Sequence, residues 1–155
     1  MEKLSAHISW KEATHSNTAT RKGINNTPSP DQVGNMIELA QNVFEPLREW
    51  VGEPIRINSF FRSDELNKAI GGSSTSQHCA NNGAAMDIDD DYCSKTNAEL
   101  FNYIKDNLEF DQMIWEFGTL ENPDWVHVSY KSEGNRKQIL RAVRVDGKTK
   151  YLPYE

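Results

Sequence analysis

The residues of this sequence best suited to chemistry are a histidine and an aspartate in one short segment. His78 and Asp87 are nine residues apart, with the small residues Gly83, Ala84 and Ala85 between them. Imidazole and carboxylate groups are ligands of first-row metals, and small residues let the backbone approach a bound ion without obstruction. The segment therefore predicts two ligands of one metal site.

A third ligand is expected from a distant part of the chain. Apolar and polar residues alternate between Pro123 and Tyr130, as they do in a half-buried strand, and His127 lies in this run. His7 and His15 have no carboxylate or second histidine at ligand spacing, so we interpret both as surface histidines. Because of its place in this strand, His127 is the best candidate, and two distant segments would then meet at one ion.

Residues 85–89 alternate as a strand, which puts Asp87 and Asp89 on one face. From this alternation alone, either aspartate could bind the metal. Asp89, Asp90 and Asp91 are interpreted as a solvated acidic turn. The alternative is a calcium site, but the run lacks the glycine and the distal glutamate of an EF-hand loop.

Arg62 follows a predicted strand over residues 55–60, at a place where side chains commonly enter active sites. Its guanidinium is always charged and offers a planar fork of donors to a carboxylate or a developing oxyanion. A surface ion pair with one of the many acidic residues would also explain it. The residue type and its position leave both roles open.

Helix signals occur at several points of the chain. Capping-box spacings predict helix starts at Ser9, Ser29 and Thr96. The second of these helices carries an apolar stripe about four turns long, and Pro46 is expected to bend its last turns before Gly52 ends it. A shorter helix is expected to follow a capping serine at position 63, and residues 17–30 are interpreted as an ordered loop.

Strand signals complete the fold prediction. Residues 112–117 form a further strand candidate, and residues 138–153 predict a closing hairpin around the Asp146-Gly147 turn. Helices interleaved with about five or six strands are typical of an α+β domain with a largely antiparallel sheet flanked by helices.

Composition limits the functional classes. A chain of 155 residues with 37% hydrophobic residues is expected to fold as one domain over 1–155. Its net charge of -6 disfavours nucleic-acid binding, and we expect a monomer. Residues 1–6 lack the features of a secretory signal, so we expect synthesis in the cytoplasm. No segment is long enough to span a membrane, so we expect no membrane insertion. Because the cytoplasm is reducing, Cys79 and Cys93 are expected to be free thiols.

Taken together, these motifs resemble the zinc D,D-peptidases and phage endolysin peptidases of the M15 family. The family pattern runs Ser-x-His-x-x-Gly-x-Ala-x-Asp, followed far downstream by (Asp/Glu)-x-x-His. Residues 54–63, 71–72 and 125–129 also look like this family, so the resemblance covers about residues 10–131. The chain departs from the pattern by two extra residues between His78 and Gly83.

The resemblance implies a Hedgehog/DD-peptidase-like fold and a zinc ion held by His78, Asp87 and His127. It further implies that Asp124 is the catalytic acid or base, and that Arg62 stabilises the reacting carbonyl or holds a substrate carboxylate. Glu116 is the runner-up for the base; it could instead support a metal ligand or be an ordinary acid at the end of a strand.

The substrate implied by the family is the stem peptide of bacterial peptidoglycan, cut by a carboxypeptidase or endopeptidase. The expected protein is a phage-type endolysin that acts on the cell wall after release across the membrane. The alternatives are an inactive zinc-binding module that recognises the wall and a structural component of a virion.

Overall fold

A six-stranded sheet forms the centre of the computed structural model, which describes residues 2–155. Its order is β3-β4-β6-β5-β7-β8, and every neighbouring pair is antiparallel except β5 and β7. The strands are β3 (Arg56–Ser59), β4 (Ala84–Asp89), β5 (Gln112–Glu116), β6 (Trp125–Tyr130), β7 (Gln138–Val145) and β8 (Lys148–Pro153). A small antiparallel sheet joins β1 (Lys3–Ser5) to β2 (Ile8–Ser9). The predicted α+β class with a largely antiparallel sheet is confirmed.

The helices begin where the capping signals predict. Capping boxes at Ser9, Ser29 and Thr96 open α1, α3 and α6, and the Ser63 side chain caps α5. The helical segments are α1 (Trp10–Thr14), α2 (Asn17–Lys22), α3 (Pro30–Leu39), α4 (Glu45–Val51), α5 (Asp64–Ala69), the 3₁₀ turn η2 (Gln77–Cys79) and α6 (Asn97–Asn107). Within residues 2–155, no helix has both the length and the apolar character that a membrane span requires.

The interpretation of residues 17–30 as a loop was wrong for its first part, which forms α2. The Ser16 hydroxyl accepts a hydrogen bond from the backbone N–H of Ala19, and Gly23 closes the helix with φ 66°. Capping at both ends satisfies backbone groups that a polar segment of this length would otherwise leave to water.

The long core helix accommodates Pro46 by widening before it. The π-helical turn η1 (Ala40–Phe44) links α3 to α4, and the N–H of Glu45 donates to the carbonyl of Ala40. Proline has no N–H with which to continue the regular ladder and its ring crowds the preceding turn, and a π turn is one way a helix absorbs such a local change. Gly52 ends the helix with φ 72°, as predicted.

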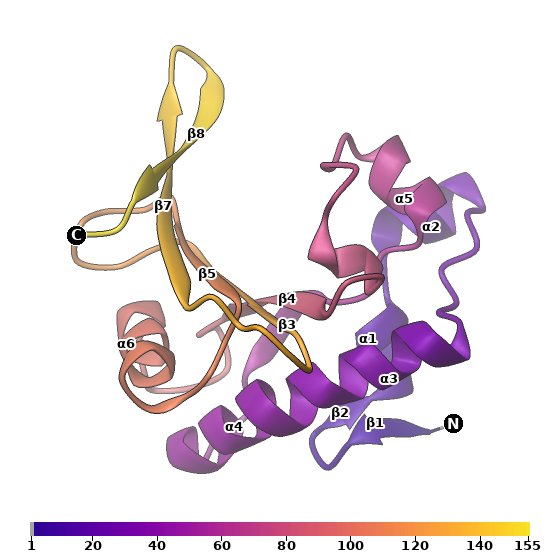
Figure 1. The fold of residues 1–155 in the computed structure, drawn as a ribbon, viewed down its shortest axis with the longest axis horizontal. Coiled ribbons are helices and arrows are strands. Elements are labelled where there is room, and N and C mark those ends of the chain that lie inside the picture. Colours follow the sequence, from indigo (N-terminus) through magenta and orange to yellow (C-terminus); the bar gives the residue numbers. More distant parts are fainter. Residues whose placement is uncertain (1) are drawn as a thin grey trace.

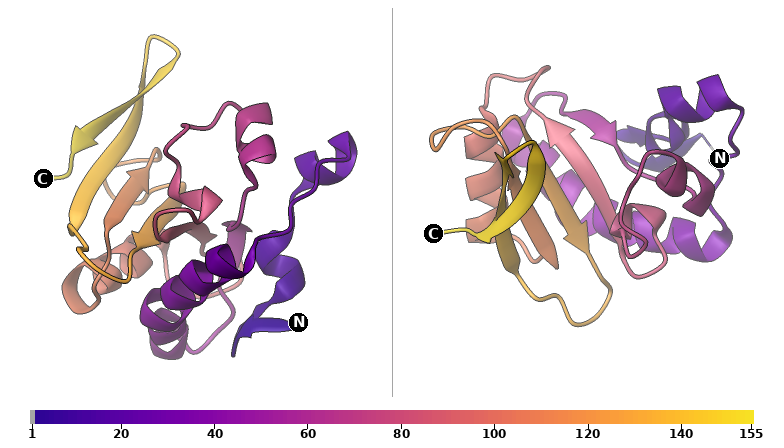
Figure 2. Two further views of the ribbon diagram at one scale, coloured as in Figure 1. Left: turned by 45° about the vertical axis from the view of Figure 1, so that its right-hand side comes forward. Right: turned by 90° about the horizontal axis from the view of Figure 1, so that it is seen from above.

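The helices α3, α4 and α6 cover one face of the sheet (Figure 1). Between them lies the hydrophobic core, to which the sheet contributes Met86, Ile88, Met113, Trp115, Val126 and Val128. On the other side of the sheet, α5 with the loop after it rises at one end and the β7–β8 hairpin rises at the other (Figures 1 and 2). The uncovered face between these two segments carries the residues that the sequence analysis singled out as metal ligands.

Candidate active site

Strand alternation places the predicted ligands on the uncovered face of the sheet. In β4, Met86 and Ile88 are buried in the core, so Asp87 points the opposite way. In β6, Val126 and Val128 face the core, and His127 shares the face of Asp87. Because Asp87 is paired with His127 across the two antiparallel strands, their side chains are direct neighbours.

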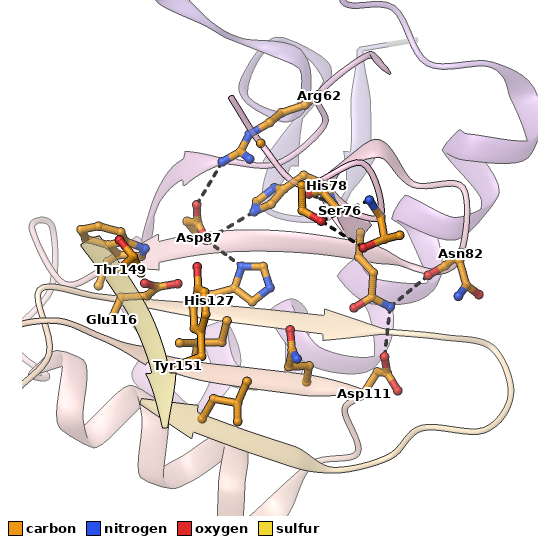
Figure 3. Close-up of a pocket in the computed structure, with 18 of the residues that line it drawn as sticks. Arg62, Ser76, His78, Asn82, Asp87, Asp111, Glu116, His127, Thr149 and Tyr151 are labelled. Atoms are coloured by element: carbon orange, nitrogen blue, oxygen red, sulfur yellow. Dashed lines mark hydrogen bonds and ion pairs between the residues drawn. The ribbon is translucent and has the colours of Figure 1, made fainter. Parts of the chain in front are cut away.

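His78, the remaining predicted ligand, lies in the η2 turn ahead of β4. His78 Nε2 lies 3.4 Å from Asp87 Oδ1, and His127 Nδ1 lies 3.0 Å from the same oxygen (Figure 3). One ligand atom from each of the three residues lies within 4.8 Å of the others. A tetrahedral zinc ion with bonds of about 2.0–2.1 Å has its ligand atoms about 3.4 Å apart, so the three residues fit this ion.

The hydrogen bond of His78 supports the same conclusion. Its Nδ1 lies 2.7 Å from the carbonyl oxygen of Phe60, which only accepts, so Nδ1 carries the proton and the neutral ring presents a lone pair at Nε2. A lone pair that faces the carboxylate of Asp87 is stabilised by a cation between them. Burial lowers the pKa of His78 despite the opposing effect of Asp87, which keeps the ring in the neutral form that binds metal.

Asp87 is ionised in this setting. Burial by itself would raise the pKa of its carboxyl, but His78 and His127 together hold that pKa well below its usual range. Arg62 adds a further positive charge, with Nη2 3.6 Å from Asp87 Oδ2 and Nε donating to the Ser59 hydroxyl at 3.2 Å. Arg62 therefore lies beside the ligand set.

The segment with two extra residues is folded against α3. The carbonyl of Cys79 accepts a hydrogen bond from Gln32, and the carbonyl of Ala80 accepts one from Asn35. Ala80 adopts φ 56°, which turns the chain sharply after His78. The insertion thus forms an anchored turn that leaves His78 facing Asp87.

The two candidate acids lie in different environments. Glu116 is on the same face of β5 as the ligands, only 7% of its surface is exposed, and it lines the cavity above them (Figure 3). Burial raises its pKa to about 7, an effect strengthened by Asp87 and opposed by His127 and Arg62.

Asp124, which the family resemblance implied as the acid or base, is exposed and lies outside the cavity lining. Its backbone N–H donates to the carbonyl of Glu116, just beyond the last pair of the β5–β6 ladder, Glu116 with Trp125. Asp124 precedes β6, and its side chain is not among those that line the cavity around His127. The geometry favours Glu116 instead.

The acidic run after β4 forms no part of this site. Asp89 and Asp90 accept hydrogen bonds from the side chain and the backbone N–H of Asn97, at the start of α6. Asp91 is paired with Arg56. These contacts anchor the start of α6. They also show that Asp89 has a different role from Asp87, a distinction that strand alternation alone could not make.

A cavity of about 870 Å³ extends over the metal ligands. Glu116, Thr149 and Tyr151 lie toward one end of it, and Asn82 and Asp111 toward the other (Figure 3). The cavity-lining residues of β7 and β8, which are Leu140, Arg144, Thr149 and Tyr151, were missed by the sequence analysis. Alternation does place Thr149 and Tyr151 on one face of the hairpin, but only the folded chain shows that this face meets the metal site.

Comparison with known protein families identifies a match that covers the site. The sequence profile of the Peptidase M15 family matches residues 6–129, which is most of the chain and includes all three candidate ligands. No curated protein matches the sequence. The β7–β8 hairpin, residues 138–153, lies outside the matched region.

Proposed function

Because this chain belongs to the Peptidase M15 family, a family of metallopeptidases, we propose that it is a zinc-dependent peptidase with Glu116 as its general base. The observation that carries the proposal is the convergence of His78, Asp87 and His127 in one cavity with Glu116 and Arg62. Two imidazoles and one carboxylate leave a fourth position open, which is the composition of a catalytic zinc site.

When bound there, zinc would polarise the scissile carbonyl and make an attacking water more acidic. Glu116 would accept the proton of that water and return it to the leaving amine. A carboxyl group with a pKa of about 7 is suited to both transfers near neutral pH. Asp87 would be the third ligand beside the two histidines, and the carbonyl of Phe60 would fix the tautomer of His78.

Arg62 has a separate role in this proposal. Its guanidinium lies at the edge of the ligand set, where it would stabilise negative charge that develops on the carbonyl oxygen during attack. The hydrogen bond to Ser59 orients the fork and leaves its outer donors for the substrate.

We further propose peptidoglycan stem peptides as the substrate and a phage-type endolysin as the biological role. The support is the resemblance of residues 54–63 and 125–129 to wall-active members of the family. In this role the enzyme reaches the wall after release from the cytoplasm and acts as a monomer.

The test is digestion of purified bacterial walls by zinc-loaded protein, with mass spectrometry of the released peptides. We expect new peptide termini, their loss after chelation and their return when zinc is added. A protein that binds one zinc ion tightly but releases nothing from walls or synthetic stem peptides would instead support a wall-recognition module. Failure to bind zinc at all would contradict the ligand assignment.

A further inference from the structure

The β7–β8 hairpin brings one arginine to the cavity that the proposed chemistry does not use. Arg144 lies on β7 two residues beyond Ala142, which is paired with Glu116 in the parallel β5–β7 ladder. Residues two apart share a face, and Arg144 accordingly lines the cavity on the side of Glu116. Its cross-strand partner Thr149 lines the same wall.

Arg144 is held by an aromatic ring rather than by an acid. Its guanidinium lies 4.7 Å from the ring centroid of Phe117, and Phe117 packs in turn on Trp125 with ring centroids 5.5 Å apart. Among residues 2–155, no carboxylate lies within ion-pair distance of Arg144. The charged fork is therefore positioned but not neutralised.

The backbone at Phe117 is adapted to this arrangement. Phe117 has φ 56°, an unfavourable value for a bulky residue, and its N–H donates to the carbonyl of Ala142 on β7. The left-handed turn interrupts the alternation of β5, so the ring lines the cavity as Glu116 does. Such a conformation persists only where surrounding contacts enforce it. Here it places the ring of Phe117 against the guanidinium of Arg144.

The side chains that line the cavity carry an excess of positive charge, which favours an acidic ligand. Four lysine and arginine side chains line it against three carboxylates, namely Arg62, Lys131, Arg136 and Arg144 against Asp87, Asp111 and Glu116. The chain as a whole carries a net charge of -6, so the positive excess is local to this cavity, and a bound zinc ion would increase it.

The other cations of the cavity already have acidic partners. The side chain of Arg136 makes two hydrogen bonds to Asp111, at 3.0 and 2.9 Å, and Lys131 Nζ lies 3.8 Å from the same carboxylate. Arg62 lies beside Asp87. Arg144 is left as the cavity cation best able to bind an acidic group of a ligand.

We propose that the β7–β8 hairpin is the specificity element of the enzyme and that Arg144 binds a free carboxylate of the substrate. The inference rests on the proposed peptidase function and deepens it. The preferred substrate is an acidic peptide whose carboxylate lies on the Glu116 side of the metal, over the ring of Phe117. Neutral and amidated peptides bind the same cavity less tightly.

The test compares stem peptides in which one carboxylate at a time is converted to its amide. For one position, we expect the wild-type kcat/KM to be about tenfold or more higher for the acid than for the amide, since hydrogen bonds to charged groups are among the stronger ones. Arg144→Gln should remove most of this preference, mainly through a higher KM for the acid. Arg144→Lys should recover part of it, because the charge remains and the fork is lost.

Lys150→Gln is the matched control. It removes one positive charge from the same hairpin, but Lys150 is exposed and lies on the face of β8 opposite Thr149 and Tyr151. This variant should keep the preference. An Arg144→Gln enzyme with an unchanged acid preference, or a wild-type enzyme with no preference at any position, would overturn the inference.

The proposed function can fail without removing this test. If the zinc-loaded protein cleaves none of the peptides, the same acid and amide pairs are compared by calorimetric binding to the wild type, Arg144→Gln and Lys150→Gln. A preference for the acid that is lost only in Arg144→Gln supports the recognition role in a non-hydrolytic protein. Equal binding of acid and amide, or no binding of either, contradicts it.

Discussion

Glu116→Gln should separate the catalytic role of this acid from its cost to stability. The pKa of the Glu116 carboxyl rises from 4.5 to about 7 on folding, chiefly through burial. The folded protein therefore favours the protonated form, and the stability tied to this proton is present below pH 4.5 and lost as the pH rises through about 7. Glutamine resembles the protonated acid and does not titrate.

The size of the effect follows from the interval between the two pKa values. Over about 2.5 pH units, at about 1.4 kcal/mol per unit, the metal-free wild type should lose about 3 kcal/mol of unfolding free energy relative to Glu116→Gln. Most of this difference should develop between pH 5 and pH 8. With a urea dependence of about 2 kcal/mol per molar, it corresponds to a midpoint shift of roughly 1.5 M.

Urea unfolding of the metal-free proteins at pH 5 and pH 8 measures this difference directly. Asp124→Asn makes the same chemical change on an exposed side chain and serves as the control, with no comparable gain at pH 8. A Glu116→Gln variant whose stability stays parallel to the wild type at both pH values would refute the burial argument.

The activity of the same two variants tests the assignment of the base. Glu116→Gln should lower the hydrolysis of stem peptides by about a hundredfold to ten-thousandfold, while zinc stays bound. Asp124→Asn should hydrolyse at close to the wild-type rate. The opposite pattern, an inactive and zinc-replete Asp124→Asn beside an active Glu116→Gln, would return the role to Asp124.

Three further changes test the metal site and its surroundings. His78→Ala should abolish stoichiometric zinc binding in equilibrium dialysis, and wild-type affinity in this variant would contradict the ligand set. Arg62→Lys keeps the charge but removes the planar fork, so kcat should fall by about tenfold or more with unchanged zinc content; normal turnover would make Arg62 a structural residue. Gly83→Ala should destabilise the protein by more than about 1 kcal/mol in thermal unfolding. The reason is that Gly83 has φ 77° and an added Cβ would lie 2.3 Å from the carbonyl oxygen of Tyr130. An unchanged unfolding midpoint would show that the loop can relax.

Local chemistry determined where most elements begin and end. The capping boxes at Ser9, Ser29 and Thr96 involve residues within three positions of each other, and the Asp146-Gly147 turn places both residues at positive φ. Such signals are readable from sequence because both partners are close along the chain. The α2 helix was missed because its composition is polar and its stability depends on caps at both ends.

The sequence also determined which residue types could bind a metal and that Asp87 and Asp89 share a face. Their different roles required the pairing of strands, because only the β4–β6 register puts Asp87 opposite His127 and leaves Asp89 to the start of α6. The assignments of ligands and base remain predictions that the variants above test.

Tertiary structure alone decided which acid enters the cavity and what surrounds it. Asp124 is three residues from His127 in sequence, yet its side chain is exposed and lies outside the cavity lining, whereas Glu116 reaches the cavity from another strand. Likewise, the hairpin could be predicted from its turn, but the parallel pairing of β7 with β5 carries Arg144 to the metal site. The pairing of β4 with β6 and of β5 with β7 depends on contacts between segments that no short turn connects, so it could not be predicted from a local pattern in the sequence.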